Sequence, residues 1–211
     1  MLKHKILTGC IAVLSVGTLT AQEQEAASTQ EKKLYLKGNA LLAPIGIINL
    51  AAEKQLSEKY TIQGDVLISP WKSFAGHELQ YYSVSVEGRY YFNQAFNHWY
   101  VGANLAASSF VLQKWNYWKD TPYVNDRGEV FTKSDLYQKG YSVIIGITGG
   151  YQFQLSDRWN MDIYAGIGTS QDFYKGYERG TGKRYDVAQK YNKSGEFLPY
   201  RGGIMLSYQI K

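Results

Sequence analysis

Apolar and polar residues alternate with a period of two along most of the chain after residue 33. The last segment illustrates the pattern: Ile204, Leu206 and Tyr208 would share one face of an extended strand, with Met205 and Ser207 on the other. Successive side chains of a β-strand point to opposite faces, whereas a helix would repeat its apolar positions every three to four residues. The alternation therefore predicts strands, each with one apolar face.

Eight runs with this alternation follow one another along the chain. The residues that mark them lie at about 34–43, about 46–55, 62–68, 82–92, 99–111, 143–155, 161–167 and 204–210. The first two runs meet at Pro44-Ile45-Gly46, residue types that favour a turn. The chain after residue 33 is therefore predicted to be one all-β domain of eight strands, residues 34–211.

The connections between these runs differ in length in a regular order. Those at 57–59, 93–98 and 156–158 are short, a loop is expected at 72–79, and the connections at about 114–139 and 174–198 are long. In an up-and-down barrel alternate connections lie at opposite ends, so the short turns would share one end and the long loops the other. Outer-membrane barrels show this asymmetry. We therefore expect an eight-stranded antiparallel up-and-down transmembrane β-barrel.

The composition of the polar face indicates which side of the strands points inward. A soluble barrel of the lipocalin kind would place its apolar face inside. Here the polar face is rich in Gly, Ser, Thr, Asn and Gln and poor in the Lys and Glu of a water-facing sheet, which favours a crowded polar lumen. Eight strands leave no open channel, so the few charges on this face are expected to pair as a plug. They are Lys37, Glu53, Asp65, Glu87, Arg89, Asp162 and Arg201.

Large aromatic residues lie near the ends of the apolar faces, and the chain contains 19 tyrosines and five tryptophans. A ring with a polar tip suits an interface between hydrocarbon and water. The predicted membrane girdles consist of Tyr60, Trp71, Phe92, Trp99, Trp115, Trp159 and Tyr208.

The first 33 residues predict export. Lys3 and Lys5 precede an apolar stretch at 6–19, and Thr20-Ala21 offers a cleavage point, so residues 1–21 are expected to be a signal peptide. Its removal would lower the net charge from +5 to +3 and would remove Cys10, the single cysteine, so no disulfide or thiolate metal site is expected. Residues 22–33 are polar and without periodicity, typical of a flexible periplasmic tail.

Four short motifs carry a resemblance to a known family: NALL at 39–42, SPW at 69–71, VEGRYYF at 86–92 and WYVG at 99–102. The chain resembles, over about 34–211, a family of Bacteroidota outer-membrane barrels whose function is unknown, and it is more distantly similar to OmpA- and OmpX-type eight-stranded barrels. The resemblance implies an outer-membrane location. Some members of that family are encoded beside fimbrial assembly genes, which implies a fimbrial protein as a partner. Barrels of this type often end on an aromatic residue, whereas this chain ends with YQIK, so their assembly signal would fall on Tyr208.

No catalytic constellation stands out in the sequence. After the signal peptide only His77 and His98 remain, and neither opens a His-x-Ser pair. The alternative function, an enzyme that modifies lipid A, would rest on His77 and Glu78 at the outer end. The four loop acids Asp120, Asp126, Glu129 and Asp135 lack the spacing of a calcium loop, and NDRG at 125–128 is typical of a hairpin turn instead. We predict no metal, no cofactor and no nucleic-acid partner.

The two long loops are the sequence's candidates for contact with other molecules. Residues 174–198 contain six basic and three acidic residues, an excess that could meet lipopolysaccharide phosphates, although an ordinary solvated loop is an equal alternative. The contact candidates are Trp118, Lys183, Arg184 and Tyr185. We therefore expect a non-enzymatic outer-membrane barrel that displays two loops for surface interaction or for the integrity of the envelope.

Overall fold

The computed structural model describes residues 32–211. The predicted signal peptide and all but the last two residues of the predicted tail lie outside this range. No helix within 32–211 is long and apolar enough to cross a membrane. The long strands are β1 (Leu34–Asn39), β2 (Ile48–Gln55), β3 (Tyr60–Phe74), β4 (His77–Tyr91), β5 (His98–Leu112), β8 (Leu136–Gln154), β9 (Trp159–Glu178) and β10 (Asn192–Gln209). Short elements interrupt the connections: β6 (Pro122–Val124), β7 (Val130–Thr132), and the 3-10 helices η1 (Ala43–Ile45), η2 (Trp115–Tyr117) and η3 (Lys133–Asp135).

The eight long strands form one closed antiparallel sheet in the order β1-β10-β9-β8-β5-β4-β3-β2. Each pairs with its neighbour along the chain, and β10 returns to pair with β1, from Tyr35–Gln209 to Asn39–Met205. The longest pairing joins β8 and β9, from Leu136–Glu178 to Gln154–Asn160. This architecture confirms the prediction of an all-β domain with eight antiparallel strands in a ring.

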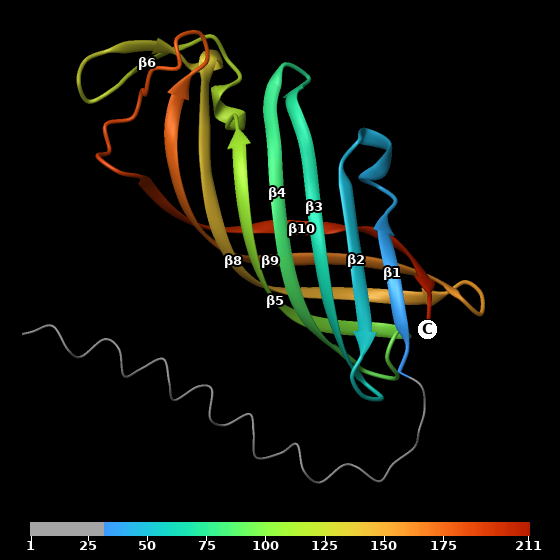
Figure 1. Ribbon diagram of the computed structural model, residues 1–211. Coiled ribbons are helices and arrows are strands. Elements are labelled where there is room, and N and C mark those ends of the chain that lie inside the picture. Colours follow the sequence, from blue (N-terminus) through green and yellow to red (C-terminus); the bar gives the residue numbers. More distant parts are fainter. Residues whose placement is uncertain (1–31) are drawn as a thin grey trace, which may run out of the picture. The chain divides into compact units, whose positions relative to one another are not determined.

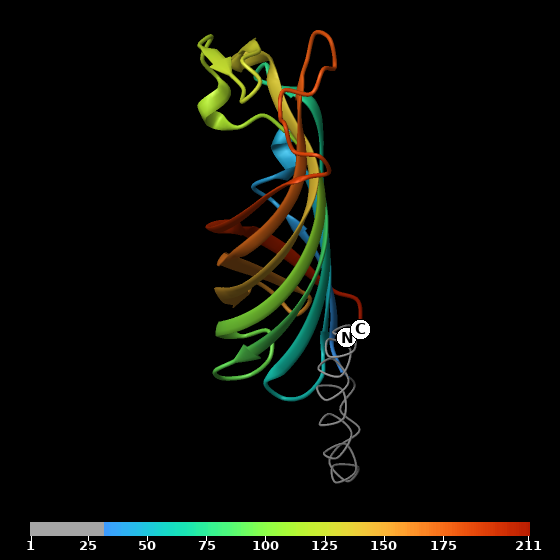
Figure 2. The same ribbon diagram turned by 90° about the vertical axis from the view of Figure 1, so that its left-hand side faces the viewer.

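The connections divide between the two ends of the barrel (Figure 1). The short turns, 56–59, 92–97 and 155–158, share what we call the turn end. The connections 40–47, 75–76, 113–135 and 179–191 share the loop end, where the β6–β7 hairpin stands above the strands (Figure 2). That hairpin carries the predicted turn at 125–128 at its tip.

Three predicted connections are shorter than expected. The prediction of a loop at 72–79 is wrong, because Phe74 pairs with His77 and only Ala75 and Gly76 form the turn. Both have positive φ, 49° and 87°, as in the tight hairpin turns that match the twist of the strands. The loops at 114–139 and 174–198 are also shorter, because β8, β9 and β10 continue past their apolar stretches with polar and aromatic residues on both faces.

The polar face of the sheet points into the lumen. Glu53 and Asp162 are completely buried, whereas Ile147 and Val84 on the opposite face are 61% and 58% exposed. The arrangement of a lipocalin-like barrel, with its apolar face inside, is therefore excluded for this domain.

A bulge in β10 brings two consecutive side chains into the lumen. The register with β9 shifts between Pro199 and Arg201, which is a position where a strand tolerates proline. As a result Tyr200 Oη donates to Asn104 Oδ1 of β5 (2.5 Å), while Arg201 Nη2 donates to Asp65 Oδ2 of β3 (2.9 Å).

Candidate functional site

Arg89 lies at the centre of a charged cluster in the half of the lumen nearer the turn end. Its Nε donates to Glu87 Oε1 (2.6 Å), and its Nη1 lies 2.8 Å from Asp162 Oδ2 and 3.2 Å from Glu53 Oε2. The guanidinium carbon is 4.4 Å from the centre of the Tyr100 ring. All four charged side chains are inaccessible to solvent, so the cation is stabilised only by the protein groups around it.

Two further cations extend this cluster into a network that we call the lumen plug. Lys37 pairs with Glu53 and with Asp162 (3.0 Å). Arg201 pairs with Asp65 (2.9 Å) and Glu87 (3.0 Å). The structure thus brings together all seven charges that the sequence placed on the polar face, three cations against four carboxylates. An uncompensated charge in this space would be costly, and the mutual pairing removes most of that cost.

Neutral donors complete the lumen plug, and sequence reasoning missed them. Thr61 Oγ1 donates to Glu53 Oε1 (2.5 Å), Tyr91 Oη lies 2.8 Å from the same oxygen, and Tyr100 Oη donates to Asp162 Oδ1 (2.9 Å). Tyr91 and Tyr100 stand next to outward aromatic residues, so their residue type did not reveal their direction. The strict alternation along β4 and β5 could have identified them as lumen residues.

The turn end of the lumen is closed by an inward fold of the 92–97 connection. Phe96, with a positive φ of 68°, is 3% exposed, and its ring lies 4.5 Å from that of Tyr35 and 6.1 Å from that of Tyr91. Asn160 Nδ2 donates to the Phe96 carbonyl (3.3 Å), which fixes the turn across the barrel mouth. The lumen plug and this aromatic stopper fill the lumen from the turn end upward.

At the loop end, Tyr185 forms the core of a small cap and is not a surface contact. It is 3% exposed, with ring centres of Tyr117, Tyr123 and Phe131 at 5.4–6.3 Å. The Asn125 side chain donates to the Tyr185 carbonyl (3.1 Å) and so joins the β6–β7 hairpin to the 179–191 connection. The prediction of Tyr185 as a contact residue is wrong because its ring is the apolar centre that the two loops share.

The two basic contact candidates, Lys183 and Arg184, have partners inside the cap. Lys183 Nζ pairs with Glu129 (2.7 Å) and stays half exposed, whereas Arg184 pairs with Asp186. Burial raises the pKa of the Asp186 carboxyl, but the hydrogen bond from Arg184 and the one from the Gly176 amide (2.7 Å) outweigh it and hold the pKa below its ordinary value. Arg184 therefore acts within its own loop, and Lys183 keeps part of its surface for contact.

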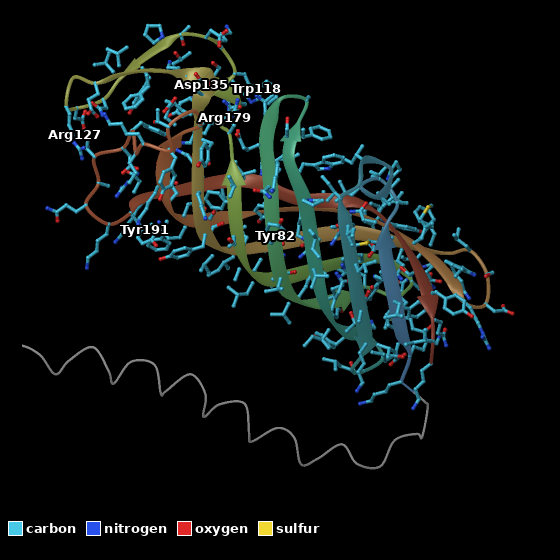
Figure 3. All side chains as sticks on the ribbon, turned by 45° about the horizontal axis from the view of Figure 1, so that its top comes forward. Tyr82, Trp118, Arg127, Asp135, Arg179 and Tyr191 are labelled. Atoms are coloured by element: carbon cyan, nitrogen blue, oxygen red, sulfur yellow. The ribbon has the colours of Figure 1, made fainter. Side chains whose placement is uncertain are left out.

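Trp118 is the most exposed aromatic group among the contact candidates, at 55%. Its ring stacks on His77, with 4.3 Å between the ring centres, and His77 Nδ1 lies 2.7 Å from Gln113 Oε1. Glu78 instead holds Arg179 through two hydrogen bonds of 2.7 and 2.9 Å. Figure 3 shows Trp118 and Arg179 beside Asp135 at the loop end. His77 and Glu78 thus have separate partners and do not form an acid–base pair.

Among residues 32–211 no group of three or more His, Cys, Asp and Glu side chains is arranged to hold a metal ion. The loop acids considered from the sequence are spread over the cap: Glu129 faces Lys183, and the Asp135 carbonyl accepts from the Arg179 amide (2.8 Å).

The outward face carries two rings of aromatic residues with an apolar band between them. In the turn-end belt, neighbouring rings lie about 5 Å apart, as in Trp99–Tyr151 (5.0 Å) and Trp159–Tyr208 (5.0 Å). We define the turn-end belt as Tyr60, Tyr90, Phe92, Trp99, Tyr151, Phe153, Trp159 and Tyr208, and the loop-end belt as Tyr82, Tyr141, Phe173, Tyr191 and Phe197. Trp71, a predicted girdle residue, pairs with Leu79 on the lumen-side face of the sheet and is not part of the loop-end belt. Trp115, a predicted girdle residue, lies in η2 beyond the end of β5 and outside both belts.

Three outward lysines border the loop-end belt on β8, β9 and β10. Lys139 and Lys175 occupy directly paired positions, and Lys193 pairs with Phe173. Lys175 Nζ lies 4.9 Å from the centre of the Tyr191 ring and Lys193 Nζ lies 5.7 Å from that of Phe173. Within the described residues none of the three forms an ion pair, so this basic patch carries uncompensated positive charge.

Comparison with known proteins places the chain in a family. No curated protein and no solved structure matches it. A family model described as "Protein of unknown function (DUF3575)" matches residues 10–210, nearly the whole sequence. The chain therefore belongs to the DUF3575 family, whose function is unknown.

Proposed function

We propose that this chain is an outer-membrane protein, a non-enzymatic barrel that crosses the membrane with its eight strands and displays its cap outside the cell. The observation that carries this proposal is the apolar band between the two aromatic belts. On β10 the belts are separated by 11 positions, from Phe197 to Tyr208, and the bulge at Tyr200 keeps both residues on the outward face. At roughly 3.3 Å per residue and a tilt of about 45°, this separation spans about 26 Å, close to the apolar height of outer-membrane barrels.

The lumen and the lysine patch support the same proposal. A lumen filled with paired charges and a ring of exposed Val, Ile and Leu on the outside is the reverse of a water-soluble domain. Lys139, Lys175 and Lys193 lie at the loop-end boundary of the band, where phosphate groups of lipopolysaccharide would neutralise them. We infer that the barrel is anchored in the outer membrane at this boundary. Its cap, with Trp118 exposed, is then the surface that binds a partner, and the sequence resemblance suggests that this partner is a fimbrial protein.

Cysteine labelling of intact cells tests the location and the orientation. The described part of the chain contains no cysteine, so Trp118→Cys and Asp157→Cys each introduce one at opposite ends. A maleimide that cannot cross the outer membrane should label the Trp118 variant in intact cells and the Asp157 variant only after the outer membrane is permeabilised. Equal labelling of both in intact cells, or of neither, contradicts the proposal.

Photo-crosslinking tests the surface role of the cap. A photoreactive amino acid at position 118 should yield a discrete protein adduct in living cells, and the same group at Asn97 in the turn end should not. Adducts with lipid alone at position 118 would show that the cap covers the membrane without binding a protein there.

A further inference from the structure

The wall of the barrel is lower at the β1–β2 hairpin than elsewhere. β1 ends at Asn39, opposite Met205, and β2 begins at Ile48, opposite Ile68. The strands on either side continue, β3 to Phe74 and β10 to Asn192. Figure 1 shows the hairpin stopping short of the β3–β4 turn. The upper parts of β3 and β10 therefore face each other across a notch that only the 40–47 connection occupies.

On its β10 side this notch lies below the loop-end belt, within the apolar band, because Met205 is eight positions below Phe197. On its β3 side the notch begins at the level of the belt, since Ile68 pairs with Tyr82. The segment 38–52 contains no charged residue, and Leu41 and Ile45 in it are 55% and 41% exposed. Under the proposed function this segment faces the hydrocarbon of the outer leaflet.

The 40–47 connection is fixed to β3 and lies free of most of β10. Trp71 Nε1 donates to the Ile45 carbonyl (2.9 Å), and Gly46, with a φ of 72°, lets the Trp71 indole approach the turn closely. Towards β10, the Ala40 amide donates to the Ile204 carbonyl (2.8 Å), and the strand pairing of β10 with β1 ends there. The side of the notch along β10 is therefore not closed by strand pairing.

A cavity of about 310 Å³ lies behind the notch, above the lumen plug. It reaches the hairpin itself at Leu42 and Ile47, and its lining combines six aliphatic residues with three tyrosines and six polar or charged side chains. The surface that the walls expose to the cavity is mainly apolar, because polar side chains such as Ser69, which donates to the Leu79 carbonyl (2.5 Å), and Ser85, which donates to Asp65 (2.6 Å), already have partners. The charges on its floor, Asp65 and Arg201, are paired with each other. The volume could hold roughly ten groups of the size of a water molecule or methylene. A cavity whose exposed walls are mainly apolar favours hydrocarbon over water at this depth, because water needs several free polar partners.

We propose that an acyl chain of an outer-leaflet lipid enters this cavity through the notch between β10 and the β1–β2 hairpin. The proposal rests on the proposed function, since it needs the notch to face lipid. The chain would lie across the apolar lining, with its end near the paired Asp65 and Arg201 and its headgroup outside, level with the loop-end belt.

The alternation of the strands provides the test. The purified protein is folded into phosphatidylethanolamine vesicles that contain a phosphatidylethanolamine with a diazirine on one acyl chain, and labelled residues are located by mass spectrometry after irradiation. Lipid around the barrel labels outward residues such as Ile68 and Tyr82. An acyl chain in the cavity also labels their inward neighbours Leu67 and Tyr81. Label on outward residues alone overturns the inference, and label on neither set contradicts the membrane location itself.

A matched pair of variants on β3 identifies the route of the inward label. Leu67→Trp fills the cavity and should reduce label at Tyr81 about tenfold, because the interior has little spare volume for both groups. Ile68→Trp adds the same indole on the outward face and should leave that label unchanged. If Leu67→Trp does not fold, Ser83→Phe on β4 fills the same cavity. Inward label that persists in folded cavity-filled variants overturns the proposal.

Discussion

At the scale of single residues, Arg89 determines whether four carboxylates can share the lumen. It contacts Glu53, Glu87 and Asp162 directly, and Arg201 reaches Glu87 and Asp65 from the other side. Without Arg89 only Lys37 and Arg201 would remain, two cations against four buried carboxylates, so two negative charges would lack compensation.

Substitution Arg89→Gln should therefore lower the free energy of unfolding by about 3–5 kcal/mol, the usual cost of removing one partner from a buried ion pair. The measurement is urea unfolding of the protein folded in phospholipid vesicles, followed by tryptophan fluorescence. Lys54→Gln, an exposed lysine on β2, is the control and should change the same free energy by less than about 0.5 kcal/mol. Equal effects of the two changes would mean that the lumen plug does not stabilise the fold.

Two adjacent glycines of β8 offer a second comparison. A Cβ at Gly150 would lie 2.5 Å from Tyr100 Oη, which Asp162 holds in place, whereas a Cβ at Gly149 would meet nothing within 4 Å. Gly150→Ala should cost about 1–3 kcal/mol of unfolding free energy through overpacking. Gly149→Ala should stay within about 0.5 kcal/mol of the unchanged protein. The same urea experiment measures both, and a larger loss for Gly149→Ala would contradict the inward position of Gly150.

The seven lumen charges could be identified from the sequence because alternation assigns a face to every residue of a strand. The same rule assigns a face to each residue but does not identify its hydrogen-bond partners across the lumen. The hydrogen bonds of Tyr91 and Tyr100 could therefore be identified only from the structure of the closed barrel. Tyr185 was misassigned for a different reason: in a loop no periodicity exists, and an aromatic ring among charges suits a buried cap and an exposed contact equally well.

At the scale of elements, the cap depends on the Asp186 carboxylate. It accepts from the Gly176 amide at the end of β9 and from the Ala188 amide (3.2 Å), and it pairs with Arg184. One carboxylate thus connects the last residues of β9 to the 179–191 connection.

The cap should loosen in acid. The pKa of Asp186 is lowered by folding, so its contribution to the free energy of unfolding is complete above the unfolded value near 3.9 and is lost as the pH falls through the lower folded value. NMR titration of the Gly176 and Ala188 amide resonances should give a common midpoint below about 3.9. In Asp186→Asn both resonances should lose this titration. A midpoint above 3.9 would mean that burial outweighs the hydrogen bonds.

The existence of the strands was predictable, and their ends at the loop end were not. Beyond the apolar band β8 continues through Tyr137 and Lys139 and β9 through Lys175 and Tyr177 on the outward face, while the cap covers Gln138 on the inward face. Without one apolar face the alternation disappears although the backbone pairing goes on. At 72–79 the prediction gave a loop where the strands continue. The hairpin turn consists of Ala75 and Gly76 alone, too short a segment to be recognised from its composition.

At the scale of the whole molecule, the lumen plug and the Phe96 stopper predict a barrel that does not conduct ions. Purified protein in a planar bilayer should show no stepwise conductance, because the buried side chains of Arg89 and Tyr100 pack against each other inside a lumen that eight strands make narrow. A variant that shortens both filling groups, Arg89→Ala with Tyr100→Ala, is expected to open brief conducting states if it folds. Steady conductance of the unchanged protein would contradict the structure of the lumen.

The pairing of β1 with β10 has a consequence for how the ring comes to exist. Every other pair of neighbouring long strands is consecutive along the chain, so its hydrogen bonds can form outward from the connection between the two strands. The β1–β10 pairing instead joins residues such as Tyr35 and Gln209 from opposite ends of the domain. The entropy of closing so long a loop delays it until the intervening hairpins are in place. The penultimate state is then an open, curved sheet with two bare edges, each able to capture a neighbouring chain. The time the polypeptide spends in that state, and what shields its edges meanwhile, would set how much of it reaches the closed form.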